Sequence, residues 1–142
     1  MKNMREESKS DEETRAIGAR LALTAAIGDV YSLDGDLGSG KTEFTRGFVK
    51  ALTNGAETRS PTFSIVNTYQ TPQFPVYHFD FYRIESPNEL TSIGFDEYVY
   101  GDGVCLIEWG GLFPDLLPDY VRSVRFTYAG ENRRVIEAGF PF

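Results

Sequence analysis

The sequence has no long apolar run and very few cysteines. No window reaches the roughly 18 apolar residues that a membrane-spanning helix needs, and residues 1–14 are charged throughout. We therefore expect no membrane span and no secretory signal. Cys105 is the only cysteine among 142 residues. This excludes an intrachain disulfide, fits a reducing cytoplasm, and predicts a cytoplasmic protein.

Basic residues are also scarce, because 14 Lys and Arg stand against 21 Asp and Glu, for a net charge of −7. Autonomous binding of nucleic acid usually needs a basic surface, so this balance argues against it, although it leaves room for a basic partner. The length suits one α/β domain with little space for a lid. We expect residues 1–9 to form a flexible solvated tail and residues 10–142 to form that domain.

One segment matches in full the P-loop pattern G-x-x-x-x-G-K-[ST]. It consists of Gly35, Asp36, Leu37, Gly38, Ser39, Gly40, Lys41 and Thr42. Glycines at this spacing let the backbone turn tightly and point N–H groups at phosphate oxygens. Lys41 then supplies a positive charge to the outer phosphates, and the Thr42 hydroxyl can bind Mg²⁺. The segment predicts a nucleotide site.

The flanks of this segment agree with the motif. Residues 30–33 are β-forming and end at a turn, while Phe44, Phe48 and Leu52 have the spacing of an amphipathic helix. Strand, loop and helix are the context that a P-loop requires, which disfavours a chance Gly-rich turn. Upstream, Ser10 and Glu13 have the form of a capping box, predicting a helix from there to about residue 27.

The middle of the chain predicts antiparallel strands. Residues 63–69 and 76–82 alternate, and a loop with two prolines separates them, so we expect a hairpin beside the P-loop strand. The loop at 60–63, Ser-Pro-Thr-Phe, is interpreted either as a nucleotide-sensing switch or as a plain turn that starts a strand. Capping signals at 86–89 predict a short helix, and the last segments predict a closing hairpin over 121–138.

Residues 104–107 are four consecutive apolar residues, and Glu108 follows them. Such a run indicates a strand that is buried on both faces, as in a parallel sheet. A carboxylate at its end has the form of a Walker B segment, whose acid holds or orients Mg²⁺. The alternative is a solvated residue at the end of a strand.

Several neighbouring residues allow two interpretations. Asp80 and Glu108 are both candidate acids, with Asp80 better suited to positioning water or supporting the metal site, or simply pairing with Arg83. His78 is more often a hydrogen-bonded structural histidine than a catalyst. Trp109 is core by default, but beside a nucleotide site it could form a contact surface.

Taken together, these motifs resemble one family. The P-loop at 35–42, Ser-Pro-Thr-Phe at 60–63, His-Phe-Asp-Phe-Tyr-Arg at 78–83, Gly-Phe-Asp-Glu-Tyr at 94–98 and Ile-Glu-Trp at 107–109 occur in this order. That set is similar to the TsaE family (formerly YjeE), P-loop ATPases of bacterial tRNA threonylcarbamoyladenosine biosynthesis. The resemblance spans about residues 10–138. Gly110 and Gly111 depart from it, because relatives often carry a charged, helix-favouring segment there.

The resemblance implies a three-layer, P-loop NTPase-like α/β fold with a mixed central sheet and antiparallel hairpins. It implies ATP and Mg²⁺ as cofactors, with the metal held by Thr42 and Glu108. It also implies functional roles for Lys41, Asp80, Thr62, Trp109 and an arginine of the last hairpin, best matched by Arg134. The implied partners are the TsaD and TsaB proteins, with tRNA reached only through their complex.

Other functions fit the sequence less well. A small-molecule kinase usually needs a lid and several arginines over the phosphates, and neither is evident. A GTPase lacks support because no Asn-Lys-x-Asp motif occurs. A nucleotide-sensing interaction module with little turnover is the remaining class, and the intact Lys41, Thr42, Asp80 and Glu108 argue against it.

Overall fold

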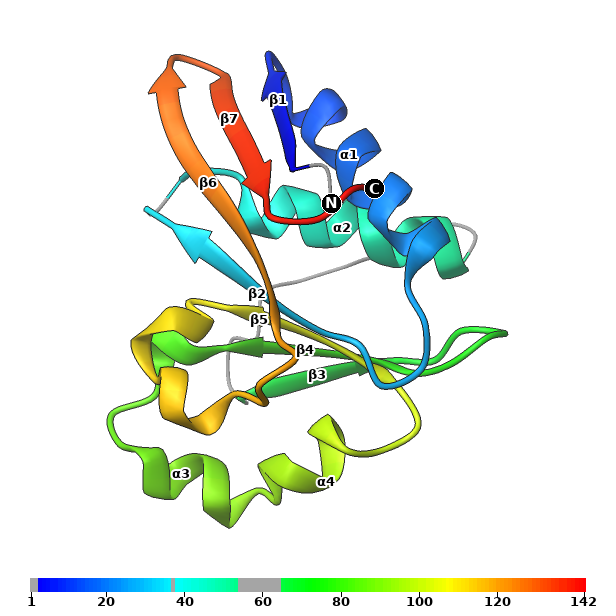
Figure 1. Cartoon of the computed structure of the whole chain (residues 1–142), viewed down its shortest axis with the longest axis vertical. Coiled ribbons are helices and arrows are strands. Elements are labelled where there is room, and N and C mark those ends of the chain that lie inside the picture. The colour runs from blue at the N-terminus through cyan, green and yellow to red at the C-terminus, as the bar shows by residue number, and fades with distance from the viewer. Residues whose placement is uncertain (1–2, 37, 54–64) are drawn as a thin grey trace.

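The protein, seen in a computed structural model that describes residues 3–36, 38–53 and 65–142, contains one mixed β-sheet. Within these residues seven strands lie in the order β1-β7-β6-β2-β5-β4-β3 (Figure 1). The strands are β1 (Met4–Ser8), β2 (Val30–Gly35), β3 (Val66–Tyr69), β4 (Val76–Asp80), β5 (Val104–Glu108), β6 (Arg122–Gly130) and β7 (Arg133–Ala138). The α-helices are α1 (Asp11–Thr24), α2 (Lys41–Thr53), α3 (Pro87–Ser92) and α4 (Phe95–Val99).

The sheet is parallel at its centre and antiparallel toward both edges. Strands β2, β5 and β4 run parallel, and β6 is also parallel to β2. The expected hairpins are present, because β3 pairs antiparallel with β4 and β6 with β7. The prediction that the first hairpin lies directly beside β2 is wrong, however. Strand β5 lies between them, since its continuous apolar run needs neighbours on both sides and cover on both faces.

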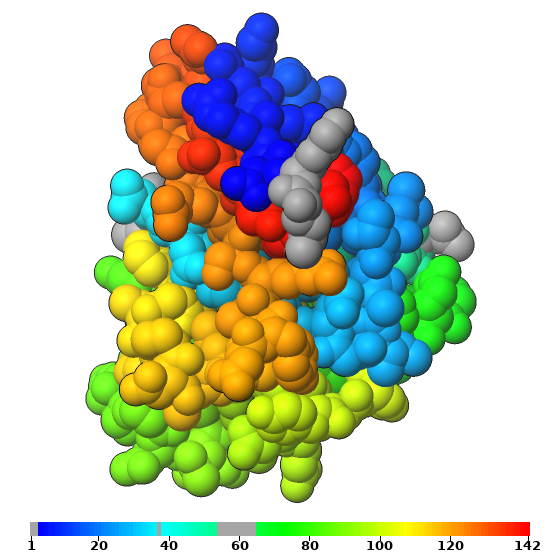
Figure 2. Space-filling model, in the orientation of Figure 1, coloured from blue at the N-terminus to red at the C-terminus, as the bar shows by residue number. Residues whose placement is uncertain are grey.

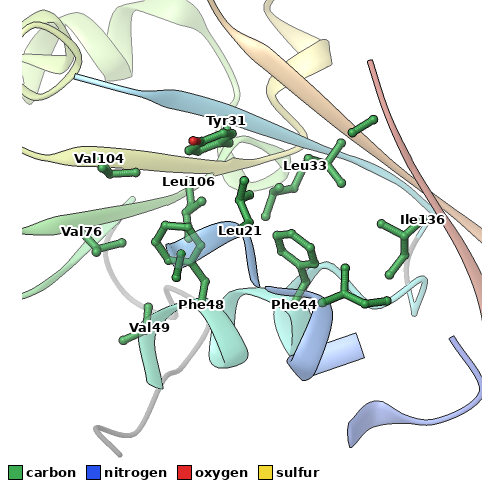
Figure 3. Packing of buried hydrophobic residues seen from close by; sticks show 14 of the residues in the cluster. Leu21, Tyr31, Leu33, Phe44, Phe48, Val49, Val76, Val104, Leu106 and Ile136 are labelled. Carbon is green, nitrogen blue, oxygen red and sulfur yellow. The ribbon is translucent and has the colours of Figure 1, made fainter. Parts of the chain in front are cut away.

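Both faces of the sheet are covered, giving three layers. Successive residues of a strand point to opposite faces, and β5 accordingly sends Val104 and Leu106 to one core and Cys105 and Ile107 to another. The first core lies under α1 and α2, and the second under α3 and α4. In Figure 3, Phe48 rises from α2 toward the side chains of the sheet.

The N-terminal segment is part of the sheet. Met4–Ser8 forms β1 and pairs antiparallel with β7, so the prediction of a flexible tail over residues 1–9 is wrong for this segment. Met4 and Ser8 are buried, whereas Arg5 and Glu7 are exposed. This is the alternation of a strand, but the many charged residues of the segment led to the prediction of a solvated tail. Figure 2 shows the dark blue N-terminal atoms packed beside the red and orange C-terminal strands.

Two predicted element ends differ from the structure. Helix α1 ends at Thr24, not near residue 27, because the Asp29 carboxylate accepts a hydrogen bond from the Ala26 N–H at 2.9 Å and closes a turn. The strand expected over 76–82 stops at Asp80, whose side chain caps a 3₁₀ turn over Phe81–Arg83. The loop at 60–63 lies outside the described residues.

Candidate active site

The P-loop connects β2 to α2 at the carboxyl edge of the parallel strands, and Lys41 is folded back onto it. The Lys41 ammonium donates to the carbonyl oxygens of Gly35 and Asp36, the latter at 2.7 Å, and to the Ser39 hydroxyl at 3.3 Å. Burial lowers the pKa of Lys41, and the nearby carboxylates of Glu108 and Asp80 oppose that effect. A bound phosphate would therefore compete with backbone carbonyl oxygens for the Lys41 ammonium.

Helix α2 starts at Lys41, so its N-terminal end faces the loop. The first N–H groups of a helix have no intrahelical acceptor, and the helix dipole makes that end positive. Gly40 is required at the helix start, because it has φ +105° and an added Cβ would lie 2.8 Å from Arg134 Cδ. Backbone donors and Lys41 together make an anion-binding concavity.

Glu108, at the end of β5, lies against the start of α2. Its side chain is almost fully buried, and its two oxygens lie 3.3 and 3.5 Å from the Thr42 hydroxyl. Hydroxyl and carboxylate oxygens are the ligands that Mg²⁺ prefers, and it usually takes further ligands from water and phosphate. Among the described residues, no group of three or more His, Cys, Asp and Glu side chains could hold a metal alone. The pair thus fits Mg²⁺ that arrives with a phosphate ligand.

Asp80 is the register partner of Glu108 on the adjacent strand β4. Its carboxylate accepts from the Tyr82 N–H at 3.1 Å and from Arg83 Nε at 3.3 Å. Burial raises the pKa of Asp80, and the charge of Glu108 adds to the rise, while Tyr82 N–H and Arg83 oppose it. The predicted alternative of a pair with Arg83 is therefore present, on a carboxylate that also borders the cleft.

Trp109 directly follows Glu108 and has a left-handed backbone, with φ 63° and ψ 29°. Its indole lies 4.4 Å from the Lys41 ammonium and 5.1 Å, between ring centroids, from Tyr82. The next turn is packed against β2: the Gly111 N–H donates to Asp34 Oδ1 at 2.8 Å. The Gly-Gly pair thus fixes the turn that places Trp109 over the P-loop lysine.

Arg134 of β7 reaches the cleft from the opposite side. Its guanidinium donates to Asp11 Oδ1 at 2.6 Å and to the Thr14 hydroxyl at 3.2 Å, and its side chain is 12 % exposed. These contacts come from the start of α1. They hold the arginine beside Gly40. The resemblance implied that an arginine of the last hairpin lies near the nucleotide, and this stays a prediction.

These residues surround a cleft of about 700 Å³. Eight of the predicted residues line it: Gly38, Gly40, Lys41, Thr42, Asp80, Glu108, Trp109 and Arg134. Gly35 and Asp36 line a neighbouring hollow instead, and Ser39 is buried. Leu37 and Thr62 lie outside the described residues. The sequence did not predict Glu43, Tyr82 or Arg83 as lining residues, and it did not predict the contact between His78 and Glu108.

The fold and the cleft define the class: an α/β protein with a Walker A loop and an acidic pair at the carboxyl edge of its parallel strands. The family model described as "Threonylcarbamoyl adenosine biosynthesis protein TsaE" matches residues 8–136. The TsaE protein of Bacillus subtilis is 42% identical over 136 residues, covering 96% of this chain and 85% of that protein. The TsaE protein of Treponema pallidum is 35% identical, covering 94% and 98%.

A solved structure gives the same result. The crystal structure of YdiB from Bacillus subtilis superposes with a TM-score of 0.79 at 37% identity, covering 96% of this chain and 84% of that one. The chain therefore belongs to the TsaE family, and its role lies in tRNA threonylcarbamoyladenosine biosynthesis. Of the helices that the structure describes, none has the length and apolar character needed to cross a bilayer.

Proposed function

We propose that this protein binds ATP with Mg²⁺ in the cleft, hydrolyses it slowly by itself, and acts on the TsaB–TsaD complex. The observation that carries the proposal is the meeting of the Walker A residues Lys41 and Thr42 with Glu108, 3.3 Å from the Thr42 hydroxyl. Family membership supports the same assignment. Bound Mg²⁺ would supply positive charge that stabilises the charge developing on the phosphoryl oxygens.

The chain's own residues divide the remaining work. Lys41 leaves the carbonyl oxygens of Gly35 and Asp36 and pairs with the outer phosphates. Thr42 and Glu108 hold the cation. Asp80, fixed by the Tyr82 N–H and by Arg83, orients a water molecule for attack. Arg134 adds a second positive charge at the wall of the cleft, where it borders Gly40.

One feature weakens ATP binding by the isolated protein, and a second disfavours direct contact with tRNA. Lys41 rests on neutral carbonyls, so part of the binding energy of the phosphates is used to free it. The net charge of −7 also disfavours a direct hold on tRNA. An acidic protein that carries a nucleotide can instead dock on a basic surface of the TsaB–TsaD complex, in competition with tRNA.

The test is ATP turnover by the purified protein, with and without TsaB–TsaD. We expect slow basal hydrolysis, acceleration by the complex, and loss of both rates in Lys41→Ala. In a gel-shift experiment, isolated tRNA should not bind at about 150 mM salt, where weak electrostatic binding is lost. Basal hydrolysis that TsaB–TsaD does not change would contradict action on that complex, and a stable binary complex with tRNA would contradict the indirect route.

A further inference from the structure

His78 makes a short hydrogen bond to the carboxylate that the proposed function assigns to the metal. Its side chain is fully buried, and its Nε2 lies 2.6 Å from Glu108 Oε2. Both residues project from the same face of adjacent parallel strands, since His78 pairs in register with Leu106, two residues before Glu108. The contact is therefore set by the sheet itself and not by a flexible loop.

The direction of this hydrogen bond follows from the chemistry of the groups. An ionised carboxylate only accepts, so Nε2 carries the proton and donates it to Oε2. The other oxygen, Oε1, is the one closer to the Thr42 hydroxyl, at 3.3 Å against 3.5 Å for Oε2. The imidazole thus holds one oxygen of the carboxylate and leaves the other toward Thr42.

A purely structural histidine would be expected to have both ring nitrogens bonded, because buried polar atoms are nearly always satisfied. Here, Nδ1 is buried without a hydrogen-bond partner in the part of the chain that the structure describes. Among the described residues, the ring therefore has one hydrogen-bond partner, Glu108.

We propose that His78 is a positioning residue, which orients Glu108 so that Oε1 faces the cation site beside Thr42; this inference rests on the proposed function. Groups that hydrogen-bond to a metal ligand orient it, and their loss typically weakens metal affinity by about 10- to 100-fold. His78 need not touch nucleotide or metal, and it acts only through Glu108.

The donor can be tested directly because His78 is the only histidine. A long-range ¹H–¹⁵N NMR spectrum of the imidazole requires no assignment in this protein. We expect a protonated Nε2, whose resonance shifts in Glu108→Gln and again when Mg²⁺ and ADP are added to the wild type. A neutral ring protonated at Nδ1 alone would overturn the proposal, since Glu108 would then be the donor.

Two variants of similar size separate the hydrogen bond from packing. Gln in His78→Gln places an amide N–H near the position of Nε2, whereas His78→Met fills the site without a donor. For each folded variant, the Mg²⁺ concentration that gives half of the ADP-dependent rise in melting temperature is measured. We expect a midpoint about 10- to 100-fold higher for His78→Met than for the wild type, and substantial recovery in His78→Gln.

The outcomes distinguish this inference from the proposed function. If the wild type shows no stabilisation by nucleotide and Mg²⁺, the proposed function fails, and this inference fails with it. If the wild type responds and both variants keep its Mg²⁺ midpoint, the positioning role alone is refuted. Should His78→Met not fold, the NMR shift in Glu108→Gln decides the question, and an unchanged Nε2 resonance would refute the contact.

Discussion

Replacing Gly110 with alanine tests how the turn after β5 places Trp109. Gly110 is buried, and a Cβ added there would lie 2.2 Å from the Ser32 hydroxyl oxygen and 3.0 Å from Ser32 Cβ. Its φ is not positive, so alanine is penalised by lack of space and not by backbone strain. The same turn carries Trp109 at φ 63° and the Gly111 N–H that binds Asp34.

The cost can be estimated from these distances. An oxygen at 2.2 Å has to move by about 1 Å to reach an ordinary contact, and overpacking of this kind typically costs about 1–3 kcal/mol. Ser32→Ala removes that oxygen and its hydrogen bond to Asp34 Oδ2, a loss of about 1.5 kcal/mol for a charged acceptor. The two changes share one contact, so the double variant should be more stable than additivity predicts by about 1 kcal/mol.

Urea unfolding of the wild type, both single variants and the double variant gives the coupling energy, with the emission of the sole tryptophan as the signal. Gly139→Ala is the matched control, because nothing lies within 4 Å of its added Cβ. It should unfold like the wild type. If Gly110→Ala lowers the free energy of unfolding by the same amount with Ser32 as with Ala at position 32, the close packing of this turn on β2 is refuted.

Two further predictions concern the acids. Asp80→Ala should keep nucleotide binding and lose turnover, whereas Glu108→Ala should also raise the Mg²⁺ requirement; equal loss of ATP affinity in both, measured by calorimetry, would contradict this division. Because the pKa of Asp80 is raised in the folded protein, its carboxyl binds a proton more tightly there than in the unfolded chain, and its ionisation lowers stability as pH rises. Asp80→Asn should therefore raise the free energy of unfolding at neutral pH, by an amount that shrinks as pH falls through the raised pKa of the folded state and vanishes below the ordinary pKa of 3.8; a constant difference would refute this.

The sequence predicted the centre of the fold well because its signals there are local. The P-loop pattern requires a strand before it and a helix after it, and β2 and α2 flank it in the structure. The apolar run at 104–107 forms β5, buried on both faces. Each of these segments carries its own hydrophobic pattern, which does not depend on distant partners.

The features that the sequence missed depend on pairing between distant segments. Strand β1 is highly charged and becomes a strand through its ladder with β7, more than a hundred residues away. The position of β5 between β2 and β4, and hence the contact of His78 with Glu108, follows from strand order. Arg134 is predicted through family resemblance, because its approach to Gly40 depends on its ion pair with Asp11 at the start of α1.

The central claim, that this cleft binds Mg²⁺ and ATP through Lys41, is tested most directly by thermal unfolding with and without the ligand. A ligand that binds only the folded state stabilises it by about 2.7 kcal/mol at 100 times its Kd. We predict a clear rise in the melting temperature of the wild type and of Lys50→Ala, a control that changes an exposed lysine on the same helix. Lys41→Ala should lose most of that rise. An unchanged wild-type melting curve at millimolar Mg²⁺ and ATP, or an equal rise in Lys41→Ala, would contradict the account.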